Sequence, residues 1–124
     1  MDLEKIAELF GVDIAESSKL HPRWSGMYIH DKRLILIRKG LDPWTYRSTL
    51  AHELAHAFYR DDSHGDTRLE RRADQWAAEL LISKDEYKAA EIIHGSHLGA
   101  IAHELGVTPE VVETWRTIHE RIRQ

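Results

Sequence analysis

The chain has 124 residues, of which 42% are hydrophobic and 31% are charged, and its formal net charge is -4. These values are typical of one globular domain, and the negative charge disfavours nucleic acid and anionic membranes as partners. The sequence contains no cysteine, so disulfides and thiolate metal sites are excluded, and any metal must be bound by His, Asp or Glu.

The beginning of the chain has acidic residues early and lacks a basic segment followed by a long apolar run, which argues against a signal peptide. No apolar stretch approaches the length of about 18 residues that a membrane-spanning helix needs. We therefore expect a cytoplasmic, monomeric protein without a membrane partner.

The first half of the chain predicts two helices on either side of a β-hairpin. Apolar residues recur at helical intervals before Gly11, and Asp42 followed by Pro43 is typical of a helix start. A β-branched run over 34–37 follows a polar turn over 30–33. The predicted order is a helix over 2–10, a connector over 11–22, a hairpin over 23–39 and a helix over about 43–59.

The second half of the chain predicts helices only. Thr67 with Glu70, and Ser83 with Glu86, have the spacing of capping boxes, so Thr67 and Ser83 should each begin a helix. The expected elements are a loop over 60–66 and helices over 67–82, 84–94, 97–105 and 109–121.

Together the elements predict an α+β fold in a single domain over residues 1–124. We divide it into a core over 1–83, which contains the hairpin, and a helical C-terminal subdomain over 84–124.

The helix over 43–59 contains the motif His-Glu-Leu-Ala-His, which begins at His52. Positions i and i+4 lie one turn apart on the same face of a helix, so the imidazoles of His52 and His56 can converge on one zinc ion at about 2.0–2.1 Å each. Glu53 lies beside that face, where it can reach a zinc-bound water without ligating the metal. There it could take a proton from the water and pass it to a leaving amine. The motif therefore predicts a zinc-dependent peptidase.

Nine residues of the chain are His, so the five-residue motif alone is only a moderate signal. The residues directly around it are uncharged and include no helix breaker, as a buried helix requires. This context favours a metal site over two incidental surface His.

A catalytic zinc usually takes three protein ligands, and three residues after the motif are candidates for the third. Asp62 stands six residues after His56, but Tyr59 replaces the glycine that would let the chain turn back, so a sharp turn is not expected. His64 lies in the next loop and could reach the metal if that loop folds over it.

Glu70 is the third candidate, and it is the one we favour. It opens the next helix, and one turn later Asp74 could accept a hydrogen bond from the second nitrogen of a ligating His. Two alternatives compete with these roles. A capping box with Thr67 would occupy the Glu70 carboxylate, and Asp74 could pair on the helix surface with Arg71 or Arg72.

The segments TLAHELAHAFY and ERRADQWAAELLIS resemble the ImmA/IrrE family of metallo-endopeptidases, and the similarity extends over residues 24–83. The second segment is the more discriminating, because six of its residues fall in register with the family pattern: Glu70, Ala73, Asp74, Ala77, Leu80 and Leu81.

This resemblance implies one Zn²⁺ bound by His52, His56 and Glu70, with Glu53 as the catalytic base. It implies a minimal zincin fold, with a small antiparallel sheet beside the active-site helix and a helical C-terminal part. It also implies a protein substrate, a helix-turn-helix transcriptional repressor, in a bacterial or phage regulatory system.

Contacts to the substrate are less defined by the sequence. Zincins hold an extended peptide along an exposed sheet edge, which the hairpin could supply, although its apolar residues could equally be plain sheet core. The oxyanion of the reaction needs a further donor, and four side chains are candidates for it or for other substrate contacts: Tyr28, Tyr59, His64 and His97.

Residues 101–116 resemble a helix-turn-helix, which gives an alternative function. Glu110 and Glu113 at the start of its second helix would face DNA phosphates, so a packed subdomain or a platform for a protein substrate is favoured over DNA binding. A non-catalytic regulator that binds a repressor is a further alternative, but it would have no need of the general base Glu53.

Overall fold

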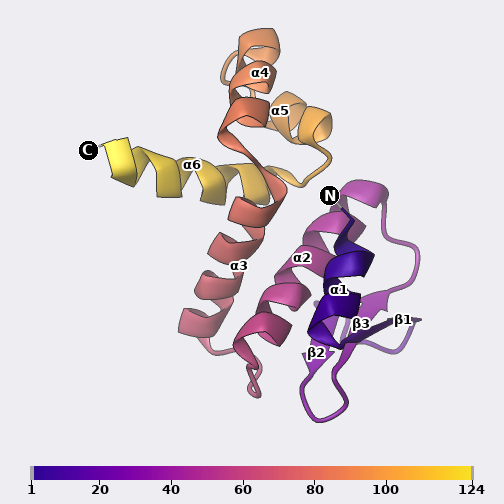
Figure 1. The fold of residues 1–124 in the computed structure, drawn as a ribbon. Helices are drawn as coiled ribbons and strands as arrows, with labels where there is room; N and C mark the ends of the chain where they lie inside the picture. The colour runs from indigo at the N-terminus through magenta and orange to yellow at the C-terminus, as the bar shows by residue number, and fades with distance from the viewer. Residues whose placement is uncertain (1, 124) are drawn as a thin grey trace.

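The computed structural model describes residues 2–123, in which a three-stranded sheet is joined to six helices (Figure 1). Met1 and Gln124, the ends of the predicted domain, lie outside the described residues. The elements in chain order are α1 (Leu3–Phe10), β1 (Asp13–Ser17), β2 (Gly26–Ile29), β3 (Leu34–Arg38), α2 (Pro43–Tyr59), α3 (Thr67–Leu81), α4 (Lys84–His94), α5 (Leu98–Leu105) and α6 (Pro109–Arg123).

The sheet has the order β1-β3-β2, and it is mixed. Strands β2 and β3 form the predicted antiparallel hairpin, with Tyr28 opposite Ile35. Strand β1 runs parallel to β3, with Ile14 opposite Ile35, so the expectations of a connector over 11–22 and of a purely antiparallel sheet were wrong. Because β3 lies in the centre, β2 presents a free edge.

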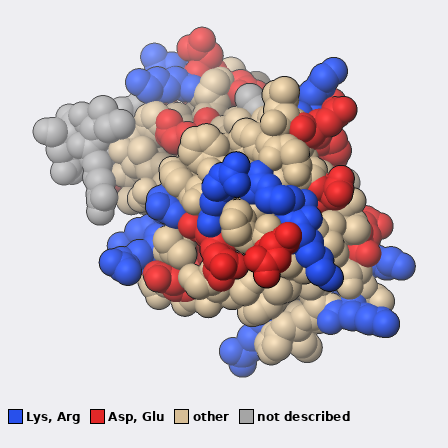
Figure 2. All heavy atoms as spheres, turned by 60° about the horizontal axis from the view of Figure 1, so that its bottom comes forward, with Lys and Arg blue, Asp and Glu red and all other residues tan. Residues whose placement is uncertain are grey.

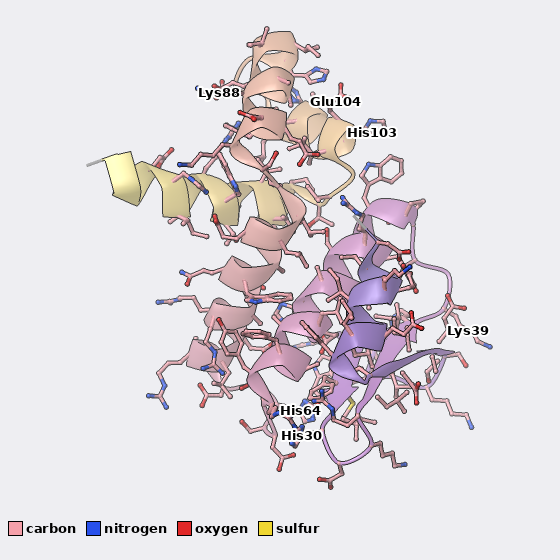
Figure 3. All side chains as sticks on the ribbon, viewed as in Figure 1. His30, Lys39, His64, Lys88, His103 and Glu104 are labelled. Carbon is pink, nitrogen blue, oxygen red and sulfur yellow. The ribbon has the colours of Figure 1, made fainter. Side chains whose placement is uncertain are left out.

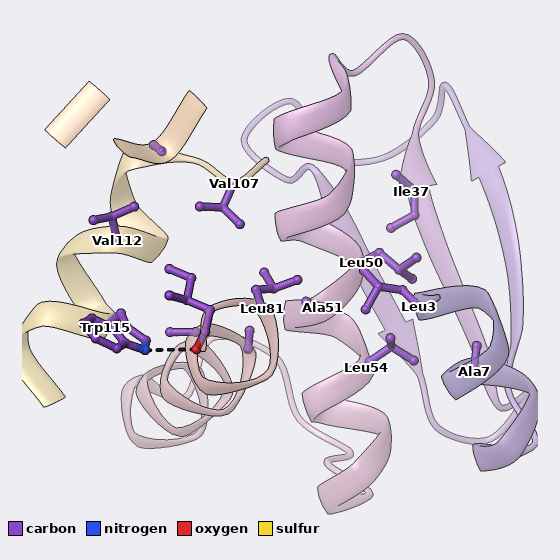
Figure 4. Packing of buried hydrophobic residues seen from close by; sticks show 14 of the residues in the cluster. Leu3, Ala7, Ile37, Leu50, Ala51, Leu54, Leu81, Val107, Val112 and Trp115 are labelled. Carbon is purple, nitrogen blue, oxygen red and sulfur yellow. Dashed lines mark hydrogen bonds between the residues drawn. The ribbon is translucent and has the colours of Figure 1, made fainter. Parts of the chain in front are cut away.

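Helix α2 lies between the sheet and the helical part of the molecule (Figure 4). Leu50 and Leu54 pack towards α1 and the sheet, while Ala51 on the opposite side faces α3. All three are fully buried, which confirms the buried helix that the uncharged sequence predicts. The motif helix is thus held by packing on two sides.

Helix α3 begins at Thr67 as predicted, but its capping differs from the prediction. Asp66, not Thr67, is the N-cap, and its carboxylate accepts hydrogen bonds from the backbone N–H groups of Arg68 and Leu69 at 2.9 and 3.4 Å. Asp is as good an N-cap as Thr, and it stands one residue earlier. The capping box that would have occupied Glu70 is therefore absent, and the Glu70 carboxylate is available for other contacts.

Helices α4, α5 and α6 pack at one end of α3 (Figure 1). The predicted capping box of Ser83 and Glu86 begins α4. The indole of Trp115 on α6 donates a hydrogen bond to the carbonyl oxygen of Ile82 at 3.1 Å, which ties α6 to the end of α3 (Figure 4). Within the part of the chain that the structure describes, no helix has both the length and the apolar character needed to cross a membrane.

Candidate metal centre

Three side chains from two helices converge on one point. His52 and His56 project from α2 with their Nε2 atoms 3.2 Å apart. Glu70, in the first turn of α3, places one carboxylate oxygen 3.1 Å from Nε2 of His52 and the other 2.7 Å from Nε2 of His56. The structure thus brings together the three residues that the sequence analysis favoured as ligands, and no other group of three or more such side chains occurs among the described residues.

The donor set and its spacing fit a zinc ion. Two His nitrogens and one carboxylate are the ligand types of a known class of catalytic zinc sites. Two ligands at the usual distance from a tetrahedral zinc lie about 3.3 Å apart, close to the separation of the two Nε2 atoms. A metal could therefore be held with little movement of the helices.

The Nδ1 atom of each of the two His, on the side of the ring away from the cluster, contacts a carboxylate. Nδ1 of His52 lies 2.8 Å from Asp74, as the spacing of Glu70 and Asp74 predicted. Nδ1 of His56 lies 2.8 Å from Asp61, a contact that the sequence analysis missed. An ionised carboxylate only accepts hydrogen bonds, so each Nδ1 is the donor and each Nε2 is left facing the cluster.

Asp62 and His64 do not join the cluster. The expectation that the chain could not turn sharply after Tyr59 was wrong, because Arg60 adopts a left-handed conformation with φ 58°. The turn brings Asp61 to His56, whereas Asp62 is exposed. A left-handed residue other than Gly, Asn or Asp gives no sequence signal, and for this reason Asp61 was not found.

The carboxylate of Glu53 lies beside the cluster. Glu53 is 7% exposed, and it has no hydrogen-bond partner among the described residues. It borders two cavities, one of about 330 Å³ with His52 and Thr49, and one of about 120 Å³ with His56 and His64. A buried carboxylate without a partner at the junction of two cavities is available to a molecule bound there.

The three acidic and basic groups of the site perturb one another. Burial alone would lower the pKa of His52. Its hydrogen bonds with Asp74 and Glu70 have the larger effect and raise this pKa to about 10. The hydrogen bond from His52 holds the pKa of Glu70 below its usual value. Burial raises the pKa of Glu53 against the opposing charges of His52 and His56, which makes Glu53 a stronger base than an exposed glutamate.

The larger cavity is formed by segments that lie far apart in the sequence. Trp24 and Gly26 line it from the start of β2, and Thr108, Glu110 and Val111 line it from the start of α6. The C-terminal helical part therefore contributes a wall to the site. At the end of the molecule that Figure 2 brings forward, acidic side chains lie next to basic ones and the visible surface is of mixed charge.

The two tyrosines that were predicted to contact the substrate, Tyr28 and Tyr59, interact with other side chains of the protein. The Tyr28 hydroxyl, on a buried side chain, is hydrogen-bonded to His30 at 2.8 Å and to Arg33 at 2.5 Å. The ring of Tyr59 lies under the guanidinium of Arg72, 3.8 Å from the ring centre. Neither tyrosine lines either of the cavities beside Glu53.

The two predicted His contacts are separated by the structure. His64, in the loop after α2, lines the smaller cavity with Glu53 and lies at the lower end of the molecule (Figure 3). His97 is instead the N-cap of α5, where its ring accepts a hydrogen bond from the backbone N–H of Ala100 at 3.1 Å. Helix α5 lies at the opposite end, as the labelled His103 shows (Figure 3). Of the four candidates, the structure places only His64 beside the site.

A small α+β domain whose central helix presents two His to a Glu on the following helix has the fold of the zincin-like class. In a comparison with protein families, the model of the IrrE N-terminal-like domain, a peptidase family, matches residues 7–114. The chain belongs to this family, which confirms the resemblance and supports a peptidase, and the matched residues include the whole cluster. No curated protein and no solved structure matches the chain.

Proposed function

We propose that this chain is a zinc-dependent endopeptidase in which His52, His56 and Glu70 hold one zinc ion and Glu53 is the general base. The observation that supports it most strongly is the convergence of the two Nε2 atoms, 3.2 Å apart, with the two Glu70 oxygens, which lie 3.1 Å from Nε2 of His52 and 2.7 Å from Nε2 of His56. Family membership and the unpartnered, buried Glu53 beside the cluster add to it.

The residues of the chain would divide the chemistry between them. When bound, the zinc ion supplies Lewis-acid chemistry, which lowers the pKa of water to about 7 and polarises a carbonyl. Glu53 accepts the proton of the attacking water and delivers it to the leaving amine. His64 shares the smaller cavity with Glu53, so it is the best-placed donor for the developing oxyanion.

The free edge of β2 would bind the substrate. Gly26 and Met27 of this strand line the smaller cavity, and Gly26 also lines the larger one. A peptide added along this edge in an extended conformation would pass from one cavity to the other beside Glu53. The side chain of Trp24, which borders both cavities and is 39% exposed, would contact the peptide.

We propose a helix-turn-helix transcriptional repressor as the substrate, since the resemblance to the family points to one. Such a substrate would place the enzyme in the cytoplasm. The start of α6 lines the larger cavity through Thr108, Glu110 and Val111, so this part of the C-terminal helices is placed to contact a protein substrate. That placement favours the platform interpretation over DNA binding for residues 101–116.

The direct test is to incubate the purified chain with a purified helix-turn-helix repressor encoded beside its gene. Cleavage products should form, disappear when a chelator is added and return when zinc is restored. A stable complex without cleavage would instead support the non-catalytic regulator. Absence of both binding and cleavage would reject the repressor as the substrate.

A further inference from the structure

The two carboxylates behind the candidate ligands are not equivalent. Asp61 and Asp74 both lie 2.8 Å from a His Nδ1. The Asp61 side chain is only 6% exposed, and that of its partner His56 is 8% exposed, whereas the Asp74 side chain is 56% exposed. Hydrogen bonds to a carboxylate are stronger where water is excluded, so the Asp61 contact should constrain its ring more firmly.

Asp61 is itself held by a second partner. Its other oxygen lies 2.6 Å from a terminal nitrogen of Arg72 on α3, and the guanidinium of Arg72 rests on the ring of Tyr59 at the end of α2. The arginine thus bridges the end of the helix that carries His56 and the helix that carries Glu70. No second partner of Asp74 of this kind occurs among the described residues.

The backbone turn at the end of α2 places Asp61. The left-handed Arg60 ends α2, and the N–H of Asp61 donates to the carbonyl oxygen of His56 at 2.9 Å. Asp61 therefore contacts His56 twice, through its backbone N–H and through its carboxylate. The contact between Asp61 and His56 is thus built into the turn that ends α2.

We propose that Asp61 is the principal positioning residue of the metal centre and that it acts through His56, with Arg72 fixing its carboxylate. The inference rests on the proposed metal site. By accepting a hydrogen bond from Nδ1, Asp61 fixes the ring so that the Nε2 lone pair faces Glu70. Because Arg72 holds Asp61 from α3, the same network also sets the distance between the ligands His56 and Glu70.

The test is zinc affinity, measured by competition with a chromophoric chelator. Asp61→Asn should weaken zinc binding by about 10- to 100-fold, as loss of such partners does in other zinc sites. The neighbouring, exposed Asp62 supplies the matched control, and Asp62→Asn should bind zinc as the wild type does. Asp74→Asn should weaken binding less than Asp61→Asn, and the opposite order would overturn the ranking.

The arginine gives an independent variant. Arg72→Gln should also weaken zinc binding, while Arg71→Gln, one residue away, should not. The absorption spectrum of the cobalt-substituted protein should change in Asp61→Asn and Arg72→Gln, because the His56 ring is no longer fixed, and stay unchanged in the controls. Circular dichroism in the presence of chelator shows whether each variant is folded; if Asp61→Asn is not, Arg72→Gln decides.

Two failures can be told apart. Wild-type affinity and spectrum in folded Asp61→Asn or Arg72→Gln would overturn the role of Asp61 and leave the metal site standing. A wild-type protein that binds no zinc would reject the metal site itself, and the role of Asp61 with it.

Discussion

Gly26 is a position where strand β2 and helix α2 are in close contact. A Cβ added to Gly26 would lie 2.6 Å from Cγ2 of Thr49, 3.1 Å from Cγ of Glu53 and 3.2 Å from the carbonyl oxygen of Leu36. An ordinary contact between carbons is about 3.5–4.0 Å, so the first distance is about 1 Å too short. The Leu36 oxygen belongs to the backbone, so either Thr49 must change its rotamer or the strand and helix must separate.

The change Gly26→Ala should therefore affect stability and catalysis together. Overpacking of this kind lowers the free energy of unfolding by about 1–3 kcal/mol. Displacing Glu53 from its place beside the cluster by part of an ångström should lower kcat/KM by up to about 100-fold. Zinc content should stay at one ion per chain, because none of the three atoms nearest the added methyl belongs to His52, His56 or Glu70.

Urea denaturation, repressor cleavage and metal analysis measure the three quantities. Gly99→Ala is the matched control, since its Cβ would meet the His97 ring at an ordinary 3.6 Å and should stabilise α5 by up to about 1 kcal/mol. Adding Thr49→Ser to Gly26→Ala removes the clashing methyl and should restore part of both losses. Wild-type stability and cleavage in Gly26→Ala would refute this account of the contact.

Three further predictions concern other parts of the fold. Because His52 has a raised pKa in the folded protein, its contribution to stability is complete below pH 6.5 and is lost as the pH rises towards about 10. Urea titrations in the presence of a chelator should therefore show that the free energy of unfolding falls as the pH rises over this range. The decrease should be smaller in Asp74→Asn. Trp115→Phe should cost about 1–3 kcal/mol in calorimetry, since the buried Ile82 carbonyl loses its donor, and an unchanged transition would contradict the bond. Arg60→Gly should raise the free energy of unfolding by about 1 kcal/mol through relief of the left-handed backbone, and a decrease would argue against that conformation.

The helices could be predicted from the sequence because their signals are local. Apolar periodicity and end residues such as Asp42, Gly11 and the Ser83 capping box act within one or two turns. The contacts of Glu70 and Asp74 with the same His could also be predicted, because a spacing of four residues places both acids on one face of α3.

The features that were missed depend on partners far away in the chain or on an unusual backbone conformation. Strand β1 contains one large apolar residue, Ile14, and it is defined by parallel pairing with β3 about 20 residues later, which no local pattern encodes. Asp61 reaches His56 only because Arg60 adopts a left-handed conformation, and its tie to Arg72 comes from tertiary packing. For this reason the sequence predicts the three candidate ligands, but not the contacts of Asp61 and Arg72 that hold His56 in place.

The central claim, that Glu53 is the general base of a zinc peptidase, is tested most directly by Glu53→Gln. Zinc content and repressor cleavage are measured side by side for this variant and the wild type. If Glu53 is the general base, both proteins should contain one zinc ion per chain, and cleavage should be abolished in Glu53→Gln. Cleavage that persists in zinc-loaded Glu53→Gln would contradict this claim.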